Sequence, residues 1–186
     1  MQGLEVLTIF DFDDTLIRAH DLRVRIVHAD GTASELPSDE YAAYDEKPGD
    51  VIDFSDFDRY PHGAEPIEKS FDEITRAISD GHDVVVLTAR KSSGPVRQFL
   101  EDHGISGMDV VGVGSSDPLA KARYVIQRIK NDDFDLVQVY EDNIRNIRAI
   151  KKVVDEHGTS FKSVKVAADG SHITLERRLF LYKLIF

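Results

Sequence analysis

The sequence contains no cysteine and no apolar run of the length that a membrane span requires. The missing cysteine excludes disulfides, zinc–thiolate sites and cysteine nucleophiles together. Apolar residues make up 41% of the chain, more than a disordered protein would carry. No repeat or low-complexity tract interrupts the 186 residues, a length that fits one domain with a modest insertion.

The first ten residues, MQGLEVLTIF, lack the basic start of a secretory signal. Their apolar run meets Asp11 after a few positions, so it predicts a buried strand and not a signal peptide. With no cysteine and no membrane segment, we expect a cytoplasmic protein.

The net charge of −11 is unevenly distributed. Residues 1–60 carry 15 acidic and 5 basic side chains, whereas residues 61–186 carry 19 and 18. Such an acidic surface repels polyanions unless a local cationic groove overrides it, and a divalent cation would offset part of the charge. A solvated acidic loop accounts for most of these carboxylates.

Apolar runs that suit buried strands alternate with stretches of helical spacing. This alternation predicts an α/β fold, a Rossmann-like parallel sheet with helices on both faces, whose reactive groups gather at the carboxyl ends of the strands. The expected strands are Leu4–Phe10, Val84–Leu87, Asp109–Val113, Leu136–Tyr140 and Ser163–Ala167, and the expected helices are Pro66–Asp80, Val96–His103, Leu119–Lys130 and Ile144–Glu156.

One stretch after the first strand departs from this alternation. Residues 22–27 alternate between apolar and polar, Asp30-Gly31 supplies a turn, and residues 51–54 form a return strand. We therefore expect a single domain over residues 1–186 with a small β-rich insertion, a cap or flap, at 18–60. The insertion is either a lid over the carboxyl edge of the sheet or an edge decoration.

The strongest motif is DFDDT at residues 11–15, directly after the first expected strand. Asp11 and Asp13 lie close enough to repel each other if both are buried. A hard divalent cation resolves that conflict, and Mg²⁺ uses one or two carboxylates together with phosphate oxygens. The alternative is an Asp-rich turn in which Thr15 caps a helix.

Three later sites have polar side chains near other strand ends. Thr88 places a hydroxyl after the strand Val84–Leu87. Lys121 lies near the start of a helix, where its charge is slightly unfavourable to the helix dipole. Glu141 and Asp142 follow the expected strand Leu136–Tyr140. Two carboxylates at this position are unfavourable in an apolar core but suit a metal site. Taken singly, Thr88 is typical of a cap and Lys121 of a solvated lysine.

In this order and strand context, the four sites resemble the signature of the haloacid dehalogenase (HAD) superfamily of phosphatases. Asp11 and Asp13 match its DxDxT motif, and Thr88, Lys121 and Asp142 match its second, third and fourth motifs. The resemblance covers residues 4–146 and implies a Mg²⁺-dependent phosphomonoester hydrolase. It implies that Asp11 attacks phosphorus, that Asp13 serves as general acid and base, and that Thr88 and Lys121 hold phosphoryl oxygens. The implied Mg²⁺ ligands are Asp11, Asp142 and the backbone carbonyl of Asp13.

The fourth motif departs from the commonest form of that family. Glu141 stands where glycine is common, and Asn146 stands where a second acid would fall. Asp142 is thus the expected direct ligand, with Glu141 or Asn146 bound through water. The run Tyr140-Glu141-Asp142, with Lys47-Pro48-Gly49 in the insertion, also resembles phage-type and RNA-repair-type members akin to the 3′-phosphatase module of polynucleotide kinases.

We expect the substrate to be a nucleotide or another small phosphomonoester, because the insertion is short and acidic. A nucleic-acid 3′-end phosphatase is the first alternative, and a non-catalytic phosphate- or metal-binding module is the second. No membrane partner is expected. Arg90 is expected to face solvent, with a contact at the rim of the site as the alternative. The apolar segment Ile173–Phe186 is expected to pack on the core or to form a homodimer surface.

Overall fold

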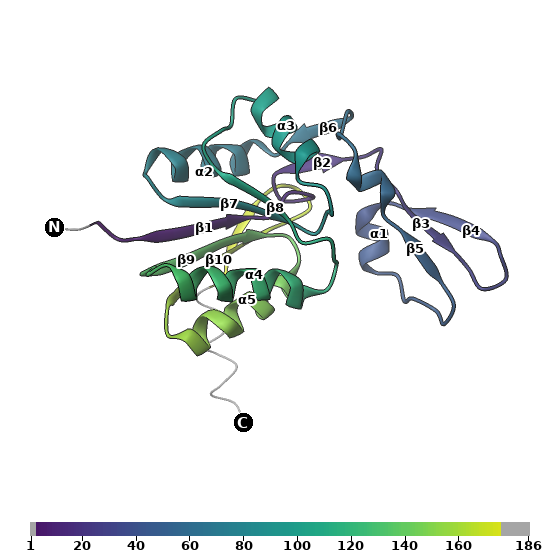
Figure 1. The fold of residues 1–186 in the computed structure, drawn as a ribbon. Helices are drawn as coiled ribbons and strands as arrows, with labels where there is room; N and C mark the ends of the chain where they lie inside the picture. Colours follow the sequence, from purple (N-terminus) through teal and green to yellow (C-terminus); the bar gives the residue numbers. More distant parts are fainter. Residues whose placement is uncertain (1–2, 176–186) are drawn as a thin grey trace.

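The computed structural model describes residues 3–175. Its centre is a mixed sheet with the strand order β11-β10-β9-β1-β7-β8, in which only the edge strand β11 is antiparallel to its neighbour. Helices flank this sheet, so the chain is an α/β protein (Figure 1). The strands are β1 (Val6–Phe10), β7 (Asp83–Thr88), β8 (Asp109–Gly112), β9 (Leu136–Glu141), β10 (Ser160–Val166) and β11 (His172–Thr174).

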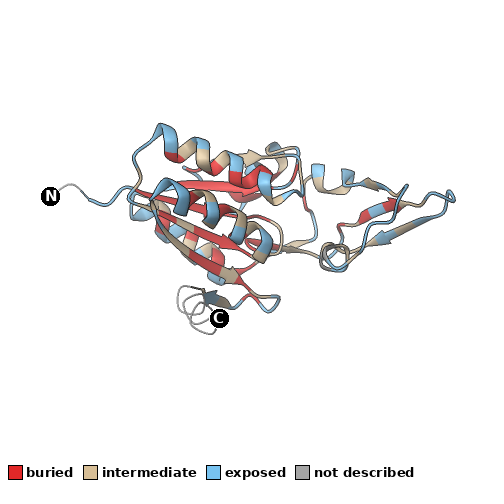
Figure 2. Ribbon diagram, turned by 90° about the horizontal axis from the view of Figure 1, so that it is seen from below, coloured by how far each residue is buried: buried red, intermediate tan, exposed pale blue. Residues whose placement is uncertain are grey.

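The side chains of the central strands alternate between two cores, one on each face of the sheet. Phe10 and Val86 pack in the core covered by α2 and α3, whereas Ile9 and Val85 pack in the core covered by α4 and α5. All five residues of β1 are buried, as Figure 2 shows in red for the strands at the centre of the molecule. The helices are α2 (Glu68–Ser79), α3 (Gly94–Asp102), α4 (Pro118–Asn131) and α5 (Ile144–His157).

The two helices on the second face begin with capping side chains, and α5 also ends on a capping glycine. Asp117 accepts a hydrogen bond from the Leu119 N–H at the start of α4, with Pro118 in the first turn. Asn143 accepts one from the Arg145 N–H at the start of α5, and Gly158 ends that helix in the left-handed conformation. Both helices therefore begin directly after the carboxyl edge of the sheet, which is where the site described below lies.

The insertion is a small antiparallel β structure that projects beyond the carboxyl ends of the strands (Figure 1). Its neck is a two-stranded pair in which Ala19 lies opposite Ala64. Beyond the neck, β3 lies between β4 and β5, and Val24 and Ile26 on β3 are buried. Its elements are β2 (Ile17–Ala19), β3 (Val24–Val27), β4 (Ala33–Leu36), α1 (Ser38–Ala42), β5 (Val51–Asp53), the 3₁₀ turn η1 (Ser55–Asp58) and β6 (Ala64–Pro66).

Every strand and helix expected from the sequence is present, with ends shifted by at most three residues. The sequence patterns missed the short elements β2, β4, β6, α1, η1 and β11, because three to five residues are too few for a periodicity. The apolar C-terminal segment falls outside the described residues from position 176 onward. Among the helices that are described, none has the length and apolarity needed to span a bilayer.

A close main-chain contact between β8 and the loop after β7 generates a stability prediction. A Cβ added at Gly112 would lie 2.5 Å from the carbonyl oxygen of Arg90 and 3.0 Å from that of Lys91. Main-chain atoms in a packed sheet cannot move aside as a flexible side chain does, so Gly112→Ala should lower the free energy of unfolding by about 1–3 kcal/mol. Denaturant titration measures this change.

Gly94→Ala is the matched control for that measurement. Gly94 begins α3, and an added Cβ would meet nothing within 4 Å. Because alanine is also the better helix former, the control should be neutral or slightly stabilising. Equal unfolding free energies for the two variants would contradict the proposed close contact.

Candidate active site

Asp11 lies at the centre of the carboxyl edge of the sheet. It follows β1, which lies between β9 and β7, and its N–H donates to the Tyr140 carbonyl on β9 at 3.0 Å. Phe10 and Tyr140 are register partners, so the residues that follow them leave the sheet at the same level. The order of the strands therefore brings Asp11 beside Glu141 and Asp142, although 130 positions separate the two motifs in the sequence.

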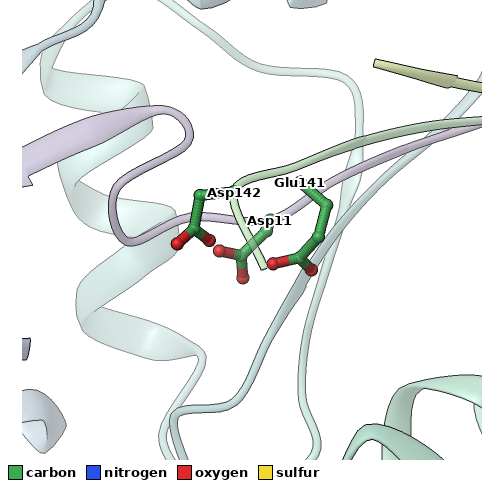
Figure 3. Close-up of side chains that lie close together, drawn as sticks. All are labelled: Asp11, Glu141 and Asp142. Atoms are coloured by element: carbon green, nitrogen blue, oxygen red, sulfur yellow. The ribbon is translucent and has the colours of Figure 1, made fainter. Parts of the chain in front are cut away.

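Three carboxyl groups meet at this edge, from Asp11, Glu141 and Asp142 (Figure 3). Each offers an oxygen that lies within 4.8 Å of an oxygen of the other two. Figure 3 shows the carboxyl group of Asp11 between those of its two neighbours. Asp11 and Glu141 are buried and Asp142 is partly exposed, so the group is open to solvent on the side of Asp142.

Lys121 supplies the positive charge closest to this group. It lies in the first turn of α4 and is 3% exposed, with Nζ 2.6 Å from Asp11 Oδ1 and 2.7 Å from Glu141 Oε2. Burial alone would lower the pKa of this lysine, but the charges of Asp11 and Glu141 outweigh burial and raise it. Lys121 therefore stays an ammonium that bridges two of the three carboxyl groups.

The carboxyl groups carry more negative charge than Lys121 alone can balance. Burial and the neighbouring Glu141 raise the pKa of Asp11 to about 7, even against the opposing effect of Lys121. Burial, Glu141 and Asp11 raise the pKa of Asp142 to about 9. A hard divalent cation prefers oxygen ligands and would relieve this repulsion, so the donor set and its electrostatics fit Mg²⁺.

A tight turn after Asp11 brings the chain back toward the site. The N–H groups of Leu16 and Ile17 both donate to the Phe12 carbonyl, and Asp14 has a positive φ of 59°. Within this turn, the buried hydroxyl of Thr15 donates to Asp11 Oδ2 at 3.4 Å and accepts from the Asp142 N–H at 3.1 Å. Thr15 thus links the first and fourth motifs directly and does not cap a helix.

The carboxyl group of Asp13 lies outside the three-carboxylate group and is held by Arg90. The guanidinium donates from Nε to Asp13 Oδ2 at 2.9 Å and from Nη2 to Asp13 Oδ1 at 2.7 Å. The expectation that Arg90 faces solvent is wrong, because only 3% of the residue is exposed. Planar guanidinium groups match carboxylates in this two-bond geometry, and the pairing makes burial of the charge tolerable.

Thr88 ends β7 at the same edge of the sheet. It is fully buried, and its hydroxyl accepts from the Arg90 N–H at 3.2 Å. Because Phe10 pairs with Val86 in register, Thr88 lies two positions further along its strand than that pair. The hydroxyl is therefore placed at the carboxyl edge, on the opposite side of β1 from Glu141.

The structure brings Asp11, Lys121 and Asp142 together and adds Glu141 as a direct partner of Lys121. Sequence reasoning missed the Arg90–Asp13 pair and the bridging hydroxyl of Thr15. The position of Arg90, two residues after a hydroxyl that ends a buried strand, was the available signal for the first. No local pattern marked the second, because the partner of Thr15 comes from a strand 127 positions away.

No family model matches this chain, and no curated protein matches it either. Among solved structures, it is similar to the Legionella pneumophila effector Ceg4, with a TM-score of 0.53 and 12% identity over 89% of this chain and 88% of that one. It is also similar to the C-terminal domain of a Pyrococcus furiosus hydrogenase, with a TM-score of 0.42 and 13% identity over 86% of this chain and 89% of that one. At 12% identity, the likeness to Ceg4 concerns the fold alone.

The burial of Asp142 and its repulsion by Glu141 and Asp11 predict an unusual dependence of stability on pH. The pKa of Asp142 rises from 3.8 to about 9 on folding, so the folded state binds protons more strongly over that interval. The free energy of unfolding of the cation-free protein should therefore fall as pH rises from about 4 to about 9. Asp142→Asn should make this slope shallower and stabilise the protein at pH 8 by at least about 1–3 kcal/mol, since each unit of the pKa shift corresponds to about 1.4 kcal/mol.

Thermal unfolding at several pH values measures this effect, with Asp133→Asn as the control at an exposed carboxylate. Added Mg²⁺ should raise the melting temperature of the original protein at pH 8 more than that of Asp142→Asn, because a ligand stabilises only the state that binds it. A slope that is the same in Asp142→Asn and Asp133→Asn would exclude strong repulsion at this site.

Proposed function

We propose that the protein is a Mg²⁺-dependent phosphomonoester hydrolase of the HAD superfamily that acts through an aspartyl-phosphate on Asp11. The observation that carries the proposal is the placement of the Asp11 carboxylate. It lies at the carboxyl edge of the central strand, hydrogen-bonded to the Lys121 ammonium and adjacent to the Asp142 carboxylate. A nucleophilic carboxylate, a fixed cation and a metal-binding carboxylate are the groups that this chemistry requires.

The wider fold supports the same proposal. After β1, the chain adds β7 and β8 on one side of that strand and then returns to add β9 and β10 on the other side. This reversal of strand order next to β1 is the arrangement of a Rossmann-like sheet. In such sheets, ligands bind outside the carboxyl ends of the strands at the point of reversal. Asp11 and Asp142 follow the two strands β1 and β9 that meet there.

In the proposed first step, a carboxylate oxygen of Asp11 bonds to phosphorus while the ester P–O bond breaks. Asp13 gives a proton to the leaving oxygen, and the alcohol departs. In the second step, water attacks phosphorus while Asp13 takes its proton. The Asp11–phosphorus bond then breaks and inorganic phosphate is released.

The remaining residues of the site stabilise charge on the phosphoryl group. Lys121 and the Thr88 hydroxyl would hold its oxygens, where negative charge must be stabilised in the transition state. Asp11, Asp142 and the backbone carbonyl of Asp13 would hold Mg²⁺, which when bound offsets the repulsion between a carboxylate and a phosphate. Glu141, which also accepts from Lys121 Nζ, would orient that ammonium.

The insertion would act as a cap that selects substrates. It projects from the edge of the sheet that carries Asp11 (Figure 1), and Ser38 on α1 donates to Asp14 at 2.8 Å. Tyr60 donates to Asp102 on α3, and Asp58 accepts from the Ser92 N–H, so η1 and the residues that follow it also contact the sheet domain. A short acidic cap suits a nucleotide or another small phosphomonoester better than a long polyanion.

Asp11→Asn tests the proposed nucleophile. The amide keeps the shape of the side chain but lacks the attacking charge, so phosphatase activity should fall by about 10³-fold or more. Because Glu141 still pairs with Lys121, the variant should remain folded. The assay uses a panel of phosphomonoesters with Mg²⁺, and chelation should abolish the activity of the original protein.

Asp133→Asn, which removes an exposed carboxylate just before β9, at the opposite end of that strand from Asp142, should keep full activity. Near-normal turnover by Asp11→Asn, or full activity of the original protein after exhaustive chelation, would require the aspartyl-phosphate mechanism to be abandoned.

Removal of the insertion tests its role in substrate choice. Since Ala19 and Ala64 are already register partners, a short Gly/Ser turn can join them in place of residues 20–63. The comparison uses two esters with similar leaving groups, a nucleoside 5′-phosphate and glycerol phosphate, so that effects on protonation cancel. The kcat/KM for the nucleoside 5′-phosphate, divided by that for glycerol phosphate, should fall by about tenfold. This is the equivalent of losing one or two positioning contacts.

A 3′-phosphorylated oligonucleotide provides the other arm of this experiment. If the acidic cap repels polyanions, the trimmed protein should hydrolyse the oligonucleotide relatively better, and more so at low salt. An original protein that already prefers the oligonucleotide would favour the end-repair alternative. Unchanged ratios in a folded trimmed protein would leave the insertion as an edge decoration.

A further inference from the structure

Arg90 occupies a position between the insertion and the first motif. One side of its guanidinium, Nε and Nη2, donates both hydrogen bonds to Asp13. The other side donates from Nη1 to the carbonyl oxygens of Phe57 at 2.8 Å and Arg59 at 3.2 Å. A single buried side chain therefore connects residues 57–59, at the end of η1 and directly after it, to the Asp13 carboxyl group.

The surroundings of Arg90 fix its position. Its guanidinium carbon lies 5.1 Å from the centre of the Phe12 ring and 5.5 Å from that of the Phe57 ring. Cation–π contacts of this kind strengthen when they are shielded from water. Its N–H donates to Thr88, and the missing Cβ of Gly112 leaves room for its carbonyl oxygen. Both the main chain and the side chain are thus held in place.

The rigidity of the guanidinium makes the two sets of contacts depend on each other. Its nitrogens lie in one plane, so the positions of the two insertion carbonyls and of the Asp13 oxygens cannot change independently. A displacement of residues 57–59 must therefore move the guanidinium relative to Asp13, or break one of the two sets of bonds. A lysine carries the same charge but lacks this fork geometry.

We propose that Arg90 is a positioning residue that couples the place of the insertion to the orientation of Asp13. The inference rests on the proposed function, in which Asp13 donates and accepts the proton. Each Asp13 oxygen accepts one N–H from Arg90 and keeps a further lone pair, so the guanidinium sets the direction from which Asp13 can meet the leaving oxygen of an ester. A displacement of the insertion on substrate binding would turn the Asp13 carboxyl group with the guanidinium, and proton transfer would then depend on the position of the insertion.

A double-mutant cycle tests this coupling. The variants are Arg90→Gln, Asp13→Asn and the two together, assayed with Mg²⁺ on an alkyl phosphomonoester and on an activated aryl phosphate. Arg90→Gln should lower kcat on the alkyl ester by about 10²-fold, within the range of general acid–base catalysis, and less on the aryl ester, which needs little protonation. KM should change by less than about threefold, because no contact with substrate is lost.

The decisive comparison is the loss of kcat that Arg90→Gln causes when Asp13 is already replaced. The effects of groups that act through each other are not additive, so Arg90→Gln should lower kcat by less than about threefold in the Asp13→Asn background. Arg90→Lys should recover part of the loss, because it restores the charge without the fork. Equal losses in the two backgrounds would overturn the inference, as would a loss confined to KM, which would make Arg90 a substrate ligand.

Two further variants separate positioning from folding. Arg128→Gln removes another ion-paired arginine, bound to Asp83, and should leave activity unchanged. Phe57→Leu removes one ring beside Arg90 but keeps its carbonyl group. It should show a smaller loss of the same kind, again only when Asp13 is present. If Arg90→Gln is too unstable to assay, the Phe57→Leu cycle decides the question by the same criterion.

The outcome also distinguishes this inference from the proposed function. An original protein that hydrolyses none of the phosphomonoesters with Mg²⁺ would overturn both. If the original protein hydrolyses a phosphomonoester but the effects of Arg90→Gln and Asp13→Asn are additive, the coupling alone would be overturned. The proposed phosphatase activity would then stand.

Discussion

The repulsion among three carboxyl groups at one edge of the sheet is the constraint on which the site depends. Parallel pairing of β1 with β9 delivers Asp11, Glu141 and Asp142 to the same level, and the buried cores on both faces of the sheet keep the strands there. Such groups remain ionised together only if positive charge is close, because water is largely excluded. Lys121 meets part of that need from α4, whereas burial and the neighbouring Glu141 and Asp11 raise the pKa of Asp142. A divalent cation would supply further positive charge at this edge.

The two acids of the first motif differ in the cation that each one contacts. Asp11 is bound to Lys121, which comes from the helix after β8, whereas Asp13 is bound to Arg90, which comes from the loop after β7. One acid therefore belongs to the rigid sheet edge, and the other is connected to the insertion through residues 57–59. Two carboxyl groups with different environments can take different chemical roles. The DFDDT motif thus contains one acid that is bound at the sheet edge and one that is connected to the insertion through Arg90.

Much of this arrangement could be predicted from the sequence, because it depends on local patterns. Alternation of buried strands with amphipathic helices predicts the sheet, and acids, a hydroxyl and a lysine at strand and helix ends predict which side chains meet at its edge. Arg90 could not be placed in the same way. An arginine after a strand is exposed in most proteins, and its burial here depends on Asp13 and on carbonyl groups of the insertion. The short strands β2 and β6 were missed for a similar reason, since pairing across the neck defines them and three residues show no periodicity.

The hydrogen bonds within the acidic group indicate which of its members a cation would bind. Glu141 has both oxygens engaged, Oε2 by Lys121 and Oε1 by the Asn143 N–H. Asp11 has one oxygen on Lys121 and a long contact of 3.4 Å from Thr15 to the other. Asp142 has no basic partner among the described residues, is the most exposed of the three, and has the higher of the two raised pKa values. A cation would therefore gain most by approaching between Asp142 and Asp11, with Glu141 left to orient Lys121. This accounts for a glutamate where glycine is common in the family that the motifs resemble, because Glu141 then serves the lysine and not the metal.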